Sequence, residues 1–117
     1  MNSFSQLDVY TRSSLLFPKV YKIVRQWKRD DQKEIGSQLI RSANSIHANI
    51  AEGSSKSRKD FARYIGTALG SCDETRSHIA DAFNVGLLSH GVKNELISEY
   101  EIVGKQLTRL KQSLSSA

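Results

Sequence analysis

The sequence has little of what stabilises secreted or membrane-bound chains: its 117 residues include one cysteine and one proline, and no long apolar run. The lone Cys72 excludes an internal disulfide and suits a reducing compartment. No apolar segment approaches the roughly 20 residues of a membrane helix, and no apolar leader opens the chain. We therefore expect a cytoplasmic protein without a membrane partner, folded as a single domain over residues 1–117.

Apolar residues recur at intervals of three or four through four segments, which is the spacing of one helix face. The segments break at Lys28–Asp31, Gly53–Ser55 and Ser89–Gly91. Ser57 is a candidate N-cap, with Asp60 three residues later. The predicted helices span residues 8–28, 33–52, 58–87 and 91–114. Because each linker is short, consecutive helices should pack antiparallel, and we predict an all-α, up-down-up-down four-helix bundle.

The same periods predict the core. Its expected members are Leu16, Val20, Ile23, Trp27, Ile35, Leu39, Ala43, Ile46, Ile50, Phe61, Ile65, Ala68, Cys72, Thr75, Ile79, Phe83, Val92, Leu96, Tyr100, Val103, Leu107, Leu110 and Leu114. Pro18 lies within the first segment, where an interior proline costs a helix about 3 kcal/mol. Either the helix kinks at Pro18 or it starts there. We favour the kink, because Val9 and Ser13 extend the core period towards the N-terminus.

Two further features are not required by a simple bundle. The first segment carries a second apolar stripe beside the core stripe, which widens its apolar arc and predicts a subunit interface of Tyr10, Phe17, Tyr21 and Val24. In the third segment Ala62, Gly66 and Gly70 recur every four residues, although each glycine costs a helix about 1 kcal/mol. Another backbone should approach these small residues, either from a second subunit or from a helix of the same chain.

Polar stripes flank the core in the two central segments. The second segment carries Gln38, Ser45, Asn49 and Glu52, and the third carries Thr67, Ser71, Glu74 and His78. If the two stripes face each other, they form a hydrogen-bonded network that must satisfy all its buried members. If they face water, they have no special role.

Basic residues are concentrated in the first half of the chain. Residues 1–63 carry a net charge of +6, and residues 64–117 a net charge of −1. Such asymmetry indicates an anionic partner, although solvated helix faces are the simpler interpretation. The candidate nucleic-acid-binding residues form one cluster around the start of the third helix and a stripe on the first: Lys56, Arg58, Lys59 and Arg63, and Lys22, Arg25 and Arg29.

Catalytic and metal chemistry find no support in the sequence. A di-iron site would need two Glu-x-x-His pairs, whereas the chain offers only Glu74 and His78, spaced by four. The three histidines show no metal-ligand spacing, and Cys72 falls on the apolar stripe of its helix. We therefore predict no enzyme activity, no metal and no cofactor.

The run Ser37–Gly53, SQLIRSANSIHANIAEG, resembles the signature of the four-helix-bundle family that is also called the 23S ribosomal RNA intervening-sequence protein family. Lys59-Asp60-Phe61, and then Gly70-Ser71 with Glu74, resemble its second signature, and Leu7-Asp8-Val9-Tyr10 resembles its opening motif. His47 departs from the family pattern, which often has proline there, and should leave the second helix straighter. The polar residues shared with the two signatures are Gln38, Arg41, Ser45, Asn49, Glu52, Ser71 and Glu74.

The resemblance implies a ring-like homopentamer with no known catalytic activity. Members are encoded within 23S ribosomal RNA genes or elsewhere in bacterial genomes, and a related branch of retroelement accessory proteins binds nucleic acid and a reverse transcriptase. We therefore predict a non-enzymatic oligomer that binds nucleic acid, with structured RNA as the favoured ligand and DNA as an open alternative. The alternative is a scaffold that binds a partner protein, such as a reverse transcriptase, and has no role with nucleic acid.

Overall fold

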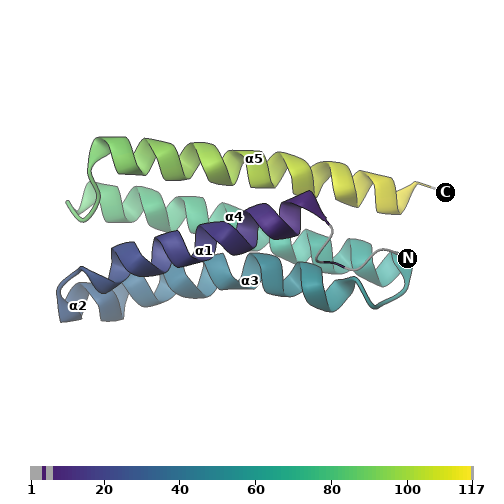
Figure 1. Ribbon diagram of the computed structural model, residues 1–117, viewed down its shortest axis with the longest axis horizontal. Coiled ribbons are helices and arrows are strands. Elements are labelled where there is room, and N and C mark those ends of the chain that lie inside the picture. Colours follow the sequence, from purple (N-terminus) through teal and green to yellow (C-terminus); the bar gives the residue numbers. More distant parts are fainter. Residues whose placement is uncertain (1–3, 5–6, 117) are drawn as a thin grey trace.

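The protein is described by a computed structural model that covers Phe4 and residues 7–116. Its helices are α1 (Asp8–Arg25), α2 (Arg29–Asp31), α3 (Ser37–Gly53), α4 (Arg58–Asn84) and α5 (His90–Ser115), with a π-helical turn, η2 (Gln32–Gly36), between α2 and α3. No strand occurs in the described ranges. Since α2, η2 and α3 are continuous, the chain forms four antiparallel helical rods in a bundle of 47 × 21 × 19 Å (Figure 1). The predicted all-α four-helix fold is confirmed.

The ends of the helices follow local signals. Ser57 caps α4 by accepting a hydrogen bond from the backbone N–H of Asp60 at 3.2 Å. The same helix ends at Asn84, three residues before the predicted end, because Gly86 adopts a left-handed φ of 86°. The N–H groups of Gly86 and Leu87 then donate to the carbonyls of Phe83 and Ala82, a Schellman motif that closes the helix.

Each helix buries one face against its neighbours in the bundle. α3 packs extensively on α4, α4 packs extensively on α5, and α1 lies mainly on α3 with few contacts to α5. The continuous core is built from Val9, Leu16, Val20, Val24, Leu39, Ala43, Ile46, Ile50, Ile65, Ala68, Cys72, Ile79, Ala82, Leu88, Leu96, Tyr100, Val103 and Leu107. None of the described helices combines the length and the apolar character needed to cross a bilayer.

Several core positions differ from those expected. The expected core residues that are only half-buried at its edge are Ile23, Trp27, Ile35, Phe61, Phe83, Val92, Leu110 and Leu114. In the first helix Val24, at 1% exposed, takes the core position instead of Ile23 and Trp27. The close approach of α1 to Gly36 explains the burial, since a Cβ on Gly36 would lie 2.5 Å from Val24 Cγ1. Near the end of α4 Ala82 is fully buried, whereas Phe83 is half-buried and lies against His90 and Lys93 of α5.

The structure also shows whether Pro18 starts the first helix or lies inside it. Because α1 runs from Asp8 to Arg25, Pro18 is an interior residue, and a helix that starts at Pro18 is excluded. The ring is exposed to solvent, away from the core. Val9 and Ser13, about two turns and one turn before Leu16, are buried, as the backward extension of the period requires.

Candidate functional site

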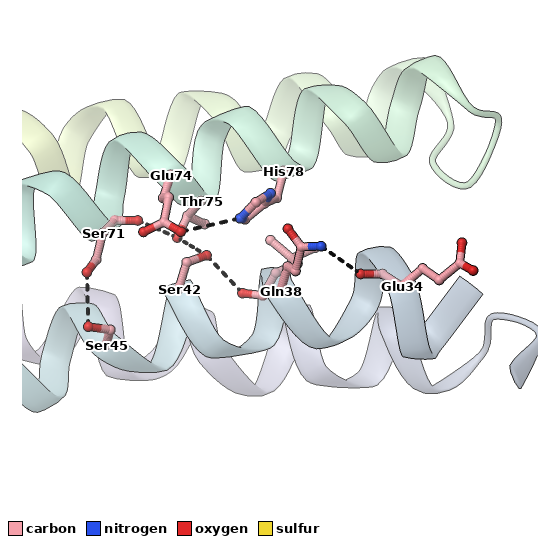
Figure 2. A network of polar contacts seen from close by, with 9 residues as sticks. Glu34, Gln38, Ser42, Ser45, Ser71, Glu74, Thr75 and His78 are labelled. Carbon is pink, nitrogen blue, oxygen red and sulfur yellow. Dashed lines mark hydrogen bonds and ion pairs between the residues drawn. The ribbon is translucent and has the colours of Figure 1, made fainter. Parts of the chain in front are cut away.

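The polar stripes of α3 and α4 face each other in the middle of the bundle. Ser71 Oγ lies 2.9 Å from Ser45 Oγ, and Thr75 Oγ1 lies 2.9 Å from Ser42 Oγ, so two hydroxyl pairs bridge the helices (Figure 2). Asn49 Nδ2 extends the network by donating to Ser45 Oγ at 2.9 Å. The buried part of the seam is therefore hydrogen-bonded, as a polar network inside a bundle must be.

The ends of the stripes do not join this network. Gln38 donates to the carbonyl of Glu34 in its own helix, at 3.2 Å. Glu52 and Thr67 are exposed. His78 Nε2 lies 3.7 Å from Glu74 Oε2, which is too long for a hydrogen bond.

Beside the hydroxyl pairs the seam opens into a polar groove of about 520 Å³ between α3 and α4. Every side chain that lines it is polar, and it includes Gln38, Arg41, Ser45, Ser71 and Glu74 from the signature-like runs. Ser42 also lines the groove, although the sequence analysis assigned it no role. The missed signal was its spacing of three from Leu39 and four from Ile46, which places it on the core face.

The basic cluster around the start of α4 contains two engaged arginines. The Arg58 guanidinium donates to the carbonyl of Ser113 in the last turn of α5, and Arg63 pairs with Asp60 at 3.3 Å. A cation is favourable at a helix C-terminus, which explains why Arg58 is tolerated at the start of α4. Lys56 and Lys59 are exposed.

α5 also carries basic residues, which the net charge of −1 for residues 64–117 did not reveal. The aliphatic stem of Lys111 passes over Gly66, where a Cβ would lie 3.2 Å from Lys111 Cε. Lys105 and Arg109 line the outer groove between α4 and α5. We call one group the α4 basic end, which consists of Lys56, Arg58, Lys59, Arg63 and Lys111. Only the antiparallel fold brings Lys111 of α5 to this end.

Lys22, Arg25 and Arg29 form a separate group, the α2 basic end. α2 lies at one end of the bundle, together with the C-terminal end of α1, and the α3–α4 connection lies at the other end (Figure 1). The continuous helical run from Arg29 to Gly53 is about 36 Å long, at 1.5 Å per residue. Since charges in salt solution act over about 8 Å, the two groups act separately within one chain.

The small residues of α4 have two different surroundings. Ala62 and Gly66 lie beside α5 of the same chain, next to Leu114 and Lys111. Gly70 is exposed, and a Cβ built on it meets nothing within 4 Å. Within the described residues the neighbour of Gly66 is a flexible lysine side chain and Gly70 has none, so the expected approach of another backbone is not found within this chain.

The second apolar stripe of α1 is largely covered by α3. Tyr10 and Phe17 are half-buried and pack edge-on against His47, with ring centroids 6.1 and 5.6 Å away. Val24 belongs to the core, so it cannot contribute to an exposed patch, and only Tyr21 is exposed, at 40%. Leu15, which belongs to neither apolar stripe of α1, is 70% exposed beside the sparse α1–α5 contact.

The potential nucleophile Cys72 is buried. Its thiol donates to the carbonyl of Tyr100 at 3.2 Å, and burial raises the pKa of the thiol to about 11. The reactive thiolate is therefore scarce at neutral pH. Across the part of the chain that the structure describes, no three His, Cys, Asp or Glu side chains gather as a metal site.

Comparisons with known proteins assign the chain to a family. The model of the 23S rRNA-intervening sequence protein family matches residues 5–109. A crystal structure of a protein of unknown function from the S23 ribosomal protein family of Bacteroides thetaiotaomicron superposes with a TM-score of 0.79 at 23% identity. The match covers 89% of this chain and 95% of that one, and shows a shared fold. No curated protein sequence matched. The chain therefore belongs to the 23S rRNA-intervening sequence protein family.

Proposed function

We propose that this protein is a non-enzymatic RNA-binding bundle whose main contact with RNA is the α4 basic end. The observation that carries the proposal is the convergence of cations from α4 and α5 at one end of the rod. Lysine and arginine neutralise phosphates and release counterions, which supplies sequence-independent affinity. The family's name links related proteins to ribosomal RNA, which favours structured RNA over DNA as the ligand.

The role of the α2 basic end is secondary in this proposal. Its three cations come from α1 and α2 alone, with Asp30 and Asp31 next to Arg29. Arg25 donates to Tyr21 Oη at 2.8 Å and lies over its ring. The two basic ends are too far apart to contact the same group of phosphates. RNA can therefore contact both only through two separate segments or through two subunits.

We further propose that the protein forms a closed oligomer, with five subunits as the family resemblance implies. Leu15 and the 37% exposed Ile102 supply apolar surface on α1 and α5. Arg12–Glu99 at 3.2 Å and Lys19–Glu95 at 2.8 Å bridge the same two helices. A ring would repeat each basic end around one axis and convert weak phosphate contacts into multivalent binding. The exposed Leu15 also suits the alternative function, a scaffold for another protein.

Binding of a labelled RNA hairpin, measured by fluorescence anisotropy at several salt concentrations, tests the proposal. The Lys59→Ala/Lys111→Ala double variant should lower the slope of log affinity against log salt by about 1.8. The Lys22→Ala/Arg29→Ala double variant removes the same charge from the other end and is the matched control. Equal losses in both would show an effect of net charge alone and contradict the assignment to the α4 basic end.

A further inference from the structure

The groove between α3 and α4 contains hydrogen-bonding groups that the chain itself does not use. Ser45 and Ser71 share one hydrogen bond, and Ser45 Oγ also accepts from Asn49 Nδ2. Whichever of the two hydroxyls donates to the other, one hydroxyl proton has no acceptor among the described residues. The pair therefore offers a donor at the wall of the groove.

Further donors and acceptors surround this hydroxyl. Gln38 uses one N–H on the carbonyl of Glu34, and its carbonyl oxygen accepts from no group in the described part of the chain. The Glu74 carboxylate makes only the long approach to His78. Figure 2 shows Gln38 and Glu74 on opposite sides of the seam, with Gln38 on α3 and Glu74 on α4. Arg41 of α3 also lines the groove.

The chemistry of the lining narrows the class of ligand. Lys33 and Arg41 balance Glu34 and Glu74 in charge, so the groove has no excess positive charge to hold a phosphate. Because every lining residue is polar, an apolar helix or a lipid chain would leave these groups without partners. A neutral, planar ring with both donors and acceptors on its edge satisfies them. Nucleobases have such edges, and an arginine guanidinium can stack on their faces.

We propose that the α3/α4 groove binds one unpaired nucleobase by its edge, with Gln38 and Glu74 as the residues that distinguish one base from another. This inference rests on the proposed RNA-binding function and adds base preference to it. Gln38 lies 15 residues before Gly53 on α3, about 22 Å along the helix axis. A single strand of several nucleotides, held by its phosphates at the α4 basic end, therefore has to extend along the bundle to place a base in the groove.

The first test compares single-stranded oligonucleotides of equal length, oligo(rA), oligo(rC) and oligo(rU), by fluorescence anisotropy at low salt. Equal phosphate numbers keep the electrostatic contribution constant. The wild type should prefer one base by about tenfold, as expected for one well-matched edge. The Gln38→Ala/Glu74→Gln double variant should lose the preference, while Lys59→Ala/Lys111→Ala should weaken all three oligonucleotides equally and keep it. Gln38 and Glu74 are exposed, so the variants should fold.

Equal binding of all three oligonucleotides by the wild type would overturn base recognition on a bound strand and leave the proposed RNA-binding function intact. Absence of binding to any oligonucleotide or hairpin would overturn that function instead. A separate readout then addresses the groove, namely ¹H–¹⁵N NMR spectra with millimolar adenosine, cytidine or uridine, which carry no phosphate. The groove predicts shifts in the Gln38 side-chain amide and the backbone amides of Ser45 and Ser71. No shift with any nucleoside would overturn it, and shifts without oligonucleotide preference would restrict the ligand to a free nucleoside and overturn the strand-bound base.

Discussion

At the scale of single residues, Tyr100 shows how this core accommodates a polar atom. Its side chain is fully buried in the core, and its hydroxyl has no hydrogen-bond partner in the described ranges. Burial raises its pKa, so the phenol stays neutral. An unpartnered buried hydroxyl costs about 1–3 kcal/mol. By contrast, the equally buried Thr75 hydroxyl bonds to both Ser42 and the carbonyl of Ser71.

Removal of these two hydroxyls should therefore have opposite effects on the free energy of unfolding. Tyr100→Phe should raise it by about 1 kcal/mol, because a desolvated group without a partner is removed. Thr75→Val should lower it by about 1–2 kcal/mol, because the buried Ser42 hydroxyl loses its partner on α4 and keeps only its bond to the carbonyl of Leu39. Urea denaturation followed by circular dichroism measures both. A loss of stability in Tyr100→Phe would indicate an ordered water or another partner at the phenol.

His47 predicts a pH dependence of stability. Burial between the aromatic rings of α1 lowers its pKa from the usual 6.5, so the folded state binds this proton less readily than the unfolded state. The contribution of neutral His47 is present above about pH 6.5 and is lost as the pH falls towards the folded pKa. His47→Gln should flatten the decline in melting temperature between neutral and mildly acidic pH. His78→Gln is the control, and equal profiles for His47→Gln and the wild type would contradict the account.

At the scale of the helical elements, glycine positions separate close packing from open surface. A Cβ on Gly53, at the end of α3, would lie 2.6 Å from Tyr64 Cβ and 2.9 Å from Phe61 Cδ1. A Cβ on Gly70 would meet nothing. Because Tyr64 and Phe61 are themselves held on α4, the first contact cannot relax cheaply.

Alanine substitutions at these two glycines should change stability in opposite directions. Gly53→Ala should lower the free energy of unfolding by about 2 kcal/mol through overpacking. Gly70→Ala should raise it by up to about 1 kcal/mol, the difference between glycine and alanine in an exposed helix. Thermal denaturation at a concentration low enough to limit association checks both. A destabilised Gly70→Ala variant would show that another chain contacts this position.

The positions of the helices were predicted from the sequence more accurately than the contacts between them. Helical periodicity located all four rods, because one apolar face per helix leaves a strong signal. The C-terminal boundary of α4 was missed by three residues, since the left-handed Gly86 ends the helix before the apolar period ends. Periodicity also could not decide that Val24 would face Gly36 or that Leu15 would remain exposed, because these depend on how closely α1 approaches α3 and α5.

Candidate site residues were predictable by type but not by grouping. The basic residues at the start of α4 were visible in the sequence, whereas Lys111 joins them only because α5 returns antiparallel to α4. The facing of Ser45 and Ser71, 26 residues apart, likewise depends on the register between two helices.

At the scale of the whole molecule, assembly is the first expectation to test. Sedimentation equilibrium at micromolar concentration should give a closed oligomer for the wild type, because Leu15 and Ile102 would otherwise remain in water. Leu15→Glu should dissociate it, since a carboxylate would be buried in the interface. Val85→Glu changes another exposed apolar residue, 60% exposed at the α4–α5 connection, and should leave the oligomer intact. A monomeric wild type would contradict the proposed ring.

The most direct test of the RNA-binding account is the affinity of the wild-type protein for a structured RNA as a function of salt. The account predicts measurable binding at low salt, with log affinity falling linearly against log salt. The slope should correspond to several neutralised phosphates, at about 0.9 per contact. A DNA duplex of the same length, measured in parallel, should bind more weakly. Absence of RNA binding at the lowest salt, or an affinity that salt leaves unchanged, would contradict the account and leave the protein-scaffold function in its place.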